Sequence, residues 1–94
     1  MTTLFVRHDI GDYAKWKRVY DALGPVRKEK GVTAASVHRE VGHPHTVVIT
    51  HRFNNAHSAQ EFANSEELKT AMDKAGVISK PEFWFAEDVE VTPY

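Results

Sequence analysis

Two histidines have the positions expected of proton-transfer groups inside a pocket. His8 follows two aliphatic residues at alternate positions of a predicted strand over residues 3–9, and His51 has the same relation to aliphatic residues in the strand 46–53. An apolar surrounding keeps imidazole neutral near pH 7, and neutral imidazole can accept a proton from a substrate. We therefore predict His8 and His51 as catalytic residues. The alternative is a pair of core histidines whose ring nitrogens are hydrogen-bonded.

Aromatic and soft side chains are spaced so that they can surround these imidazoles. Trp16 and Tyr20 are one helical turn apart, so both face the same side of a predicted helix. Apolar walls with few polar groups suit a flat ligand. The residues that we expect to bind the substrate are Trp16, Tyr20, Phe62, Met72 and Phe85. An ordinary packed core is the alternative explanation for the same residues.

Several other chemistries lack the residues that they need. The chain has no cysteine, which excludes disulfides, iron–sulfur sites and thiolate zinc sites. The pair His43 and His45 has an H-x-H spacing, but it is predicted in a solvated turn and no acid is placed to complete a metal site. The motifs G-x-S-x-G, G-x-G-x-x-G and G-x-x-x-x-G-K do not occur. We expect no metal site and no cofactor.

Length and charge narrow the class of protein further. The 94 residues predict a single domain, residues 1–94, and 12 basic against 13 acidic residues give a formal charge of -1. A nucleic-acid-binding protein would be strongly basic. No apolar run reaches the ~18 residues of a membrane span, and no secretory signal is recognisable. We expect a cytoplasmic protein that binds neither nucleic acid nor membrane.

The order of elements predicts how the histidines are held. Strands are predicted over 3–9, 32–40, 46–53 and 83–91, with a turn at 42–45 and helical segments at 13–23, 26–30, 56–63 and 65–75. This β-α-β-β-α-β order favours an α+β ferredoxin-like fold, a four-stranded antiparallel sheet with the helices on one face. We expect the first and third strands to be adjacent and parallel, which would make His8 and His51 neighbours.

The other face of the predicted sheet also carries large apolar residues. Phe5, Val48 and Trp84 fall on that face together with Arg7 and Arg52. A lone subunit would leave this apolar patch in water. A twofold partner that packs sheet against sheet would cover it, and we expect the two arginines to pair with Asp9, Asp88 or Glu90 at the rim.

Three segments resemble a known superfamily over nearly the whole chain. They are Leu4-Phe5-Val6-Arg7-His8, Asp12-Tyr13-x-x-Trp16-Lys17 and Phe62-Ala63-Asn64-Ser65-Glu66-Glu67-Leu68. Together with the element order they resemble the dimeric α+β barrel superfamily, and within it the small proteins of the antibiotic-biosynthesis-monooxygenase type, some of which are labelled cyclases. The resemblance implies a homodimer with a ligand cavity between sheet and helices in each subunit.

The resemblance also separates the chemistries found among such proteins. Heme-degrading relatives use an Asn, a Trp and a His at positions that match His8, Phe62 and Met72, so heme degradation is not implied. A plant cyclase uses a Tyr and a His where this chain has Phe62 and Leu68, so that mechanism is not implied either. Cofactor-free oxygenases of anthrone-like substrates use Asn, Trp, Tyr and Arg, to which Trp16, Tyr20 and His8 offer a similar set.

The leading hypothesis is therefore a homodimer that binds a small apolar or aromatic molecule in each subunit. It could act as a cofactor-free monooxygenase or a polyketide-cyclase-type enzyme. His8, assisted by His51, would then move a proton while Trp16, Tyr20 and Phe62 position the ring system. The alternative is a non-catalytic ligand-binding or stress-response protein with the same fold and a pocket that side chains mostly fill.

Overall fold

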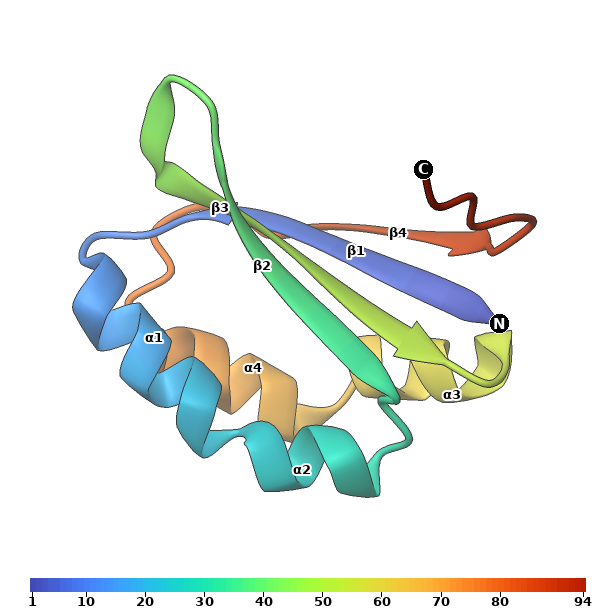
Figure 1. The fold of residues 1–94 in the computed structure, drawn as a ribbon. Helices are drawn as coiled ribbons and strands as arrows, with labels where there is room; N and C mark the ends of the chain where they lie inside the picture. Colours follow the sequence, from blue (N-terminus) through green and yellow to red (C-terminus); the bar gives the residue numbers. More distant parts are fainter.

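The computed structural model describes residues 1–94 as one twisted sheet with every helix beneath one of its faces (Figure 1). The elements in chain order are β1 (Thr2–Asp9), α1 (Tyr13–Ala22), α2 (Gly24–Glu29), β2 (Ala34–Glu40), β3 (His43–Phe53), α3 (Ala56–Ala63), α4 (Glu66–Ala75) and β4 (Glu82–Glu87). The strands lie in the order β2-β3-β1-β4, and all neighbouring pairs are antiparallel. The ferredoxin-like fold is confirmed, and each of its two crossover connections carries two helices, as the sequence predicted.

The alternation of side chains along β1 determines which of its residues are buried. Thr2, Leu4, Val6 and His8 are buried beneath the helices, whereas the residues between them are half-buried on the other face. β1 lies between β3 and β4, so its helix-facing residues are enclosed on three sides. His8 therefore lies among the buried residues beneath the helices, although its side chain is polar.

Local capping sets where each helix begins and ends. The Asp12 carboxylate accepts hydrogen bonds from the backbone N–H groups of Ala14 and Lys15, both at 3.3 Å, and starts α1 soon after β1 ends. Pro25 lies in the first turn of α2, which separates α1 from α2 as the sequence indicates. Gly76 ends α4 with φ 77°, a conformation that favours glycine. These short connections hold α1 and α4 against the central strands.

The hairpin between β2 and β3 is tighter than predicted. β3 begins at His43, and the turn consists of Val41 and Gly42, whose φ is 80°. The prediction of a turn over 42–45 was therefore wrong, because a register shift after Arg39 lets Glu40 pair with His43 and extends the ladder. His43 and His45 lie on an exposed strand end instead of in a loop.

The last strand is shorter than the predicted range 83–91. β4 pairs only with β1, and its Glu87 lies opposite Thr2 near the start of the chain. The backbone N–H of Asp88 still donates to the carbonyl of Met1 at 2.8 Å. The ladder between β1 and β4 ends there, because β1 begins at Thr2. The chain beyond Glu87 leaves the sheet as a tail that extends away from it (Figure 1).

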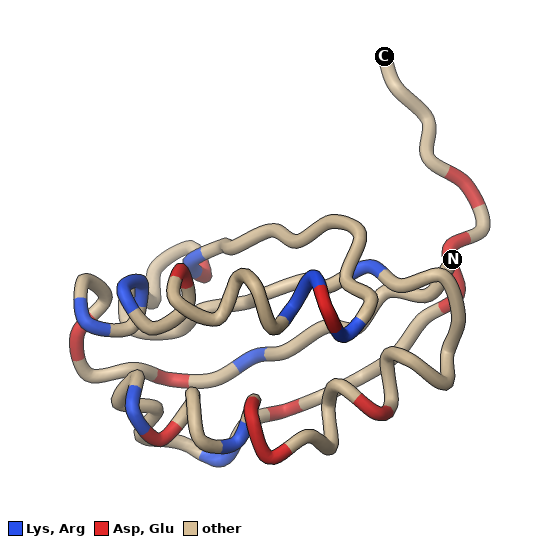
Figure 2. Tube along the Cα trace, turned by 90° about the horizontal axis from the view of Figure 1, so that it is seen from below, with Lys and Arg blue, Asp and Glu red and all other residues tan.

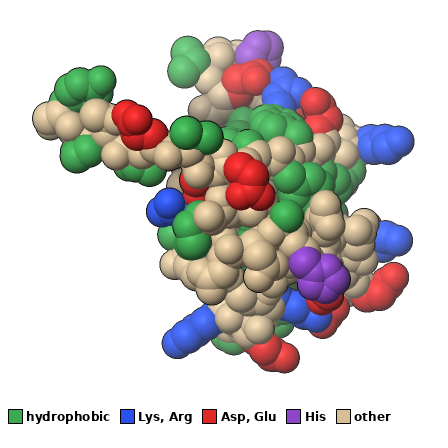
Figure 3. Space-filling view, turned by 90° about the vertical axis from the view of Figure 1, so that its right-hand side faces the viewer, with side chains coloured by type: hydrophobic (Ala, Val, Ile, Leu, Met, Phe, Trp, Pro, Cys, Tyr) green, Lys and Arg blue, Asp and Glu red, His purple; other side chains and the backbone are tan.

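We use the term open face for the side of the sheet that carries no helix. Phe5 and Trp84 stack there with ring centroids 5.4 Å apart, and the Trp84 residue is 42% exposed. Figure 3 shows hydrophobic side chains gathered on the upper part of the molecule, where Figure 1 shows no helix. Arg7 crosses the open face and pairs with Glu40 at 3.0 Å and Glu82 at 2.9 Å.

Both arginines of the open face are paired within their own chain. Arg7 takes Glu40 and Glu82 instead of the acids that were predicted for it, while the Arg52 Nε donates to Asp88 at 2.8 Å. The predicted pairing of Arg52 with Asp88 is therefore confirmed, whereas the acids predicted for Arg7 are wrong, because Glu40 and Glu82 lie closer to its guanidinium.

Basic and acidic residues are interspersed along the helices (Figure 2). None of the helices has the length and apolar character needed to cross a membrane.

Candidate functional site

A small apolar cavity lies between the two central strands and helices α1, α2 and α4. Its volume is about 40 Å³, and ten of its thirteen lining residues are hydrophobic. The three others are His8, His51 and Arg27, so two imidazoles and one guanidinium supply its polar character. A single water needs roughly 10–15 Å³, whereas pockets for drug-sized ligands measure roughly 300–1,000 Å³. In this conformation the cavity has room for water but not for a ring system.

His8 is held by a hydrogen bond from Trp16. Its residue is 4% exposed, and its Nε2 accepts from the indole Nε1–H of Trp16 at 3.1 Å. The buried Nδ1 of the same ring has no partner. Burial lowers the pKa of His8 from 6.5 to about 4, and the charge of Asp9 opposes this effect. His8 is therefore neutral at physiological pH.

His51 is equally buried but makes no side-chain hydrogen bond. Its ring lies 5.0 Å from that of Phe62, and its Nδ1 is buried without a partner. Burial lowers the pKa of His51 from 6.5 to about 4, and the positive charge of Arg27 adds to the lowering. His51 is therefore neutral at physiological pH, and no side chain engages its ring nitrogens.

The two imidazoles line the same cavity without being neighbours on adjacent strands. β1 and β3 are antiparallel, and their register places His51 opposite Leu4 and His8 opposite Val47. Four residues of strand separate the two positions, or about 13 Å between their Cα atoms. The predicted parallel pairing was wrong, because a β3 that returns through the β2–β3 hairpin must run opposite to β1 in this topology. The histidines face the cavity from its two ends.

Stacked aromatic rings form one wall of the cavity. The Trp16 and Tyr20 rings are 5.2 Å apart and inclined by 17°, and Tyr13 continues the stack at 5.9 Å from Trp16. Met72 of α4 lines the cavity as well. The structure thus brings three of the five predicted substrate-binding residues, Trp16, Tyr20 and Met72, to the two histidines.

Phe62 and Phe85 do not line the cavity, although both were predicted to do so. Phe62 is fully buried between His51 and Phe53, at 5.0 and 5.7 Å between ring centroids, so it supports the imidazole from behind. Phe85 is 40% exposed and lies opposite Leu4 on the edge strand β4, outside the cavity lining. Helical spacing placed Phe62 on the buried side of its helix and alternation placed Phe85 on its strand, but neither pattern shows which elements line the cavity.

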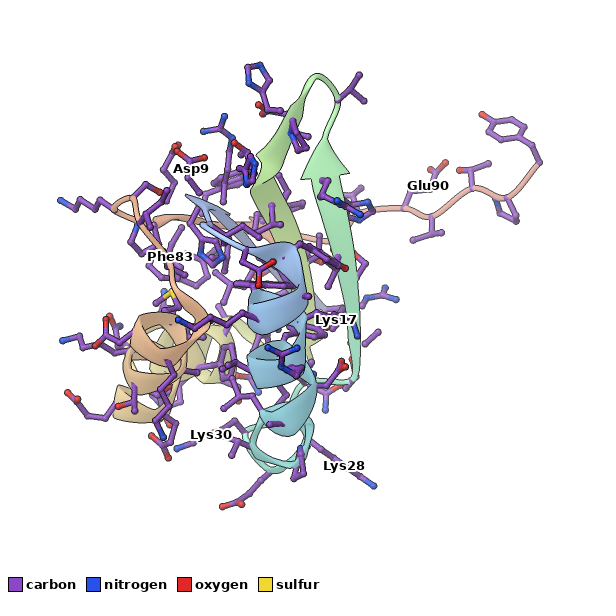
Figure 4. The ribbon with its side chains drawn as sticks, turned by 90° about the vertical axis from the view of Figure 1, so that its left-hand side faces the viewer. Asp9, Lys17, Lys28, Lys30, Phe83 and Glu90 are labelled. Carbon is purple, nitrogen blue, oxygen red and sulfur yellow. The ribbon has the colours of Figure 1, made fainter.

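Arg27 is a cavity residue that the sequence analysis did not select. Its guanidinium lies 3.8 Å from the centroid of the Tyr20 ring and donates through Nη1 to the Tyr20 carbonyl at 2.7 Å. The neighbouring Lys28 and Lys30 project away from the sheet (Figure 4). The sequence signal that could have found Arg27 is its distance from Tyr20. The two residues are seven positions apart, which is about two helical turns and places them on the same side of a helix.

A wall of three side chains lies at the boundary between the cavity and a surface groove. A groove of about 400 Å³ runs between α1 and α4, and Val19, Leu23 and Ala71 line both this groove and the cavity. All three side chains of this wall are half-buried rather than sealed in the core. A ligand that reached the imidazoles through the groove would have to displace this wall.

No cluster of three or more His, Cys, Asp or Glu side chains in the chain has the geometry to hold a metal ion. The buried polar groups of the cavity are imidazoles and a guanidinium, and only two of them can ligate metal.

The chain belongs to the antibiotic biosynthesis monooxygenase family, whose model matches residues 5–74. A search of the curated proteins finds no match to this sequence. The fold is similar to that of SnoaB, a cofactor-independent oxygenase from Streptomyces nogalater, with 13% identity, a TM-score of 0.79, and 99% of this chain and 97% of that chain covered.

Two other solved structures have the same fold. One is a protein of unknown function from Nitrosomonas europaea, with 19% identity, a TM-score of 0.76, and 99% of this chain and 93% of that chain covered. The other is a conserved protein from Methanosarcina mazei, with 12% identity, a TM-score of 0.75, and 94% and 92% covered. At these identities the likeness concerns the fold alone.

Proposed function

We propose that this protein, a single domain over residues 1–94, is a homodimeric cofactor-independent monooxygenase of a small, flat, apolar aromatic molecule. The observation that carries the proposal is the pair of buried imidazoles, each with an unpartnered Nδ1, beside an apolar cavity. An unsatisfied buried polar atom costs about 1–3 kcal/mol, and aliphatic residues at these positions would avoid that cost. A ligand oxygen or an exchanged proton would use the nitrogens that the protein leaves free.

The reaction that fits these groups converts an acidic methylene into a ketone, as in an anthrone. A neutral imidazole accepts one methylene proton, and the resulting carbanion delocalises its charge onto the ring oxygen. The carbanion passes an electron to dioxygen, and recombination forms a carbon–oxygen bond. The peroxide then loses water, so that the CH2 group and O2 become C=O and H2O. The positive charge of Arg27 favours the anionic intermediate in an apolar site.

The dimer is supported by the open face. The stacked Phe5 and Trp84 rings expose apolar surface that a lone subunit leaves in water. A second copy packed sheet against sheet would bury these rings without any change to the cavity on the opposite side of the sheet. The interface and the site are therefore separate features of the proposal.

A non-catalytic ligand-binding protein is the second candidate, and the size of the cavity favours it. A cavity of about 40 Å³ is far smaller than an anthrone, so turnover requires the wall between cavity and groove to move. If that wall stays closed, the imidazoles are core residues and the protein binds at most a small molecule.

Air oxidation of anthrone tests the two candidates. We expect the protein to accelerate oxygen uptake and anthraquinone formation, with no reductant, flavin or metal added. His8→Ala and His51→Ala should each lower the rate, whereas His45→Ala, an exposed histidine of β3, should not. Rates equal to buffer, together with quenching of tryptophan fluorescence by anthraquinone, would establish binding without catalysis and refute the oxygenase.

A further inference from the structure

We infer that Trp16 is a positioning residue that makes His8 a hydrogen-bond donor to a ligand oxygen, which leaves His51 as the only cavity imidazole able to accept a proton. The roles in this inference rest on the proposed function. The proton position that it assigns to His8 is a property of the free protein and can be tested by itself.

The hydrogen bond between the two rings assigns the proton on His8. An indole N–H can only donate, so the Nε2 atom that receives it at 3.1 Å carries a lone pair and no proton. A neutral imidazole has one proton, which must then lie on Nδ1. The opposite tautomer would point two N–H groups at each other inside the core, where neither could find water. The contact therefore selects the Nδ1–H tautomer.

The selected proton lies on an atom that has no acceptor within the protein. Nδ1 of His8 is buried and unpartnered, and the cavity lining contains no carboxylate that could receive its hydrogen bond. A buried donor without an acceptor binds best to a ligand that brings one. The ligand class is accordingly a flat aromatic ketone, enol or phenol whose oxygen approaches His8. A pure hydrocarbon would leave this donor unsatisfied.

His51 differs because no donor constrains it. Its ring makes no side-chain hydrogen bond, and its neighbours are the Phe62 ring and the Arg27 charge. Neither tautomer is excluded, so a nitrogen lone pair can be turned toward an acidic methylene. The two imidazoles therefore divide the work: His8 binds the oxygen on which negative charge develops, and His51 takes the proton. This division reverses the leading role that the sequence suggested for His8.

Nitrogen NMR of the 15N-labelled protein measures the proton position directly. We expect the His8 ring at pH 7 to show a protonated Nδ1 and an unprotonated Nε2. Trp16→Phe removes the indole donor and should shift a measurable share of His8 to the Nε2–H tautomer. Trp84→Phe is the matched control, because it makes the same change on the open face and should leave the His8 signals as they were. An Nε2–H tautomer in the wild-type protein would overturn the inference.

A ligand pair with and without an oxygen tests the donor role. Fluorenone and fluorene are flat tricycles that differ in one carbonyl. We expect fluorenone to shift the His8 Nδ1–H resonance and fluorene to leave it unchanged, with backbone amide spectra confirming that each variant is folded. Equal shifts with both probes would mean that the ring senses only packing, and the donor role would be refuted.

Side-chain replacement separates a donor from a base. Asparagine can place an N–H near the former Nδ1, whereas glutamine reaches the former Nε2. If anthrone is turned over, His8→Gln should lower kcat on the order of 10²-fold, as loss of one donor to a developing oxyanion does, while His8→Asn restores most of it. Equal losses in the two variants would make His8 the base and overturn the inference. A correct His8 tautomer in a protein that fails to oxidise anthrone refutes the oxygenase alone.

Discussion

Acidification from pH 7 to pH 5 should destabilise the protein through its two buried imidazoles. Burial holds the pKa of both His8 and His51 at about 4, against 6.5 for an imidazole in water. Between pH 6.5 and pH 4 the two imidazoles are mostly protonated in the unfolded chain and mostly neutral in the folded protein. The free energy of unfolding therefore falls as the pH drops below 6.5 and levels off below about 4, whereas above pH 7 these two groups no longer contribute to its pH dependence.

The size of the effect follows from the same two values. A pKa lowered from 6.5 to about 4 corresponds to about 3 kcal/mol per imidazole in the acid limit. About 2 kcal/mol of this is lost between pH 7 and pH 5, so the two histidines together remove about 4 kcal/mol. Domains of this size have a total stability of roughly 5–15 kcal/mol, so the loss is easily measured.

Urea unfolding followed by circular dichroism at pH 7, 6 and 5 measures this loss at constant protein concentration. His51→Leu is the decisive variant, because His51 makes no side-chain hydrogen bond and its removal leaves no partner unsatisfied. We expect it to halve the dependence on pH. His45→Leu makes the same change at an exposed position of β3 and should retain the wild-type dependence.

Two results would refute this reasoning. Stability that stays constant from pH 7 to pH 5 would mean that the imidazoles are protonated in the folded protein or reached by water. A His51→Leu variant with the full wild-type dependence would mean that other groups bind the protons. Asp88 provides little interference, since hydrogen bonds from Thr3 and Arg52 lower its pKa and move its titration further into acid.

Three further predictions concern the interface, the wall and the core. Trp84→Glu places a charge on the open face and should shift the protein from dimer to monomer in light scattering; an unchanged mass would refute the sheet-to-sheet interface. Leu23→Ala should join groove and cavity and tighten binding of fluorenone in a fluorescence titration, at a cost of about 1–2 kcal/mol; weaker binding would contradict the proposed route. Phe62→Ala should lower the free energy of unfolding by about 3–5 kcal/mol in urea, since the ring is fully buried.

The elements of the fold were predictable because each has a local cause. Alternating apolar residues define β1 and β3, and Asp12, Pro25 and Gly76 set helix boundaries within a few residues. The errors occurred where a distant partner decides the outcome. The end of β4 depends on where β1 begins, and the start of β3 depends on a register shift against β2.

The candidate site was predictable in part for the same reason. The burial of His8 and His51 follows from alternation on their own strands, and Trp16 and Tyr20 follow from helical spacing. Arg27 was missed because its inward direction depends on how α2, which begins at Gly24, is set relative to α1. Phe85 lies outside the cavity lining because its strand is at the edge of the sheet, away from the two central strands that carry the imidazoles.

By itself, the sequence determined which side chains face the helices, since a period of two along a strand and of 3.6 along a helix is a property of the local backbone. Only the tertiary structure decided how those side chains meet. The antiparallel register put the two imidazoles at opposite ends of one cavity, and the packing of α1 on β1 brought the indole N–H of Trp16 to His8. Such contacts join residues that no local periodicity relates, because the path of the whole chain sets their distance.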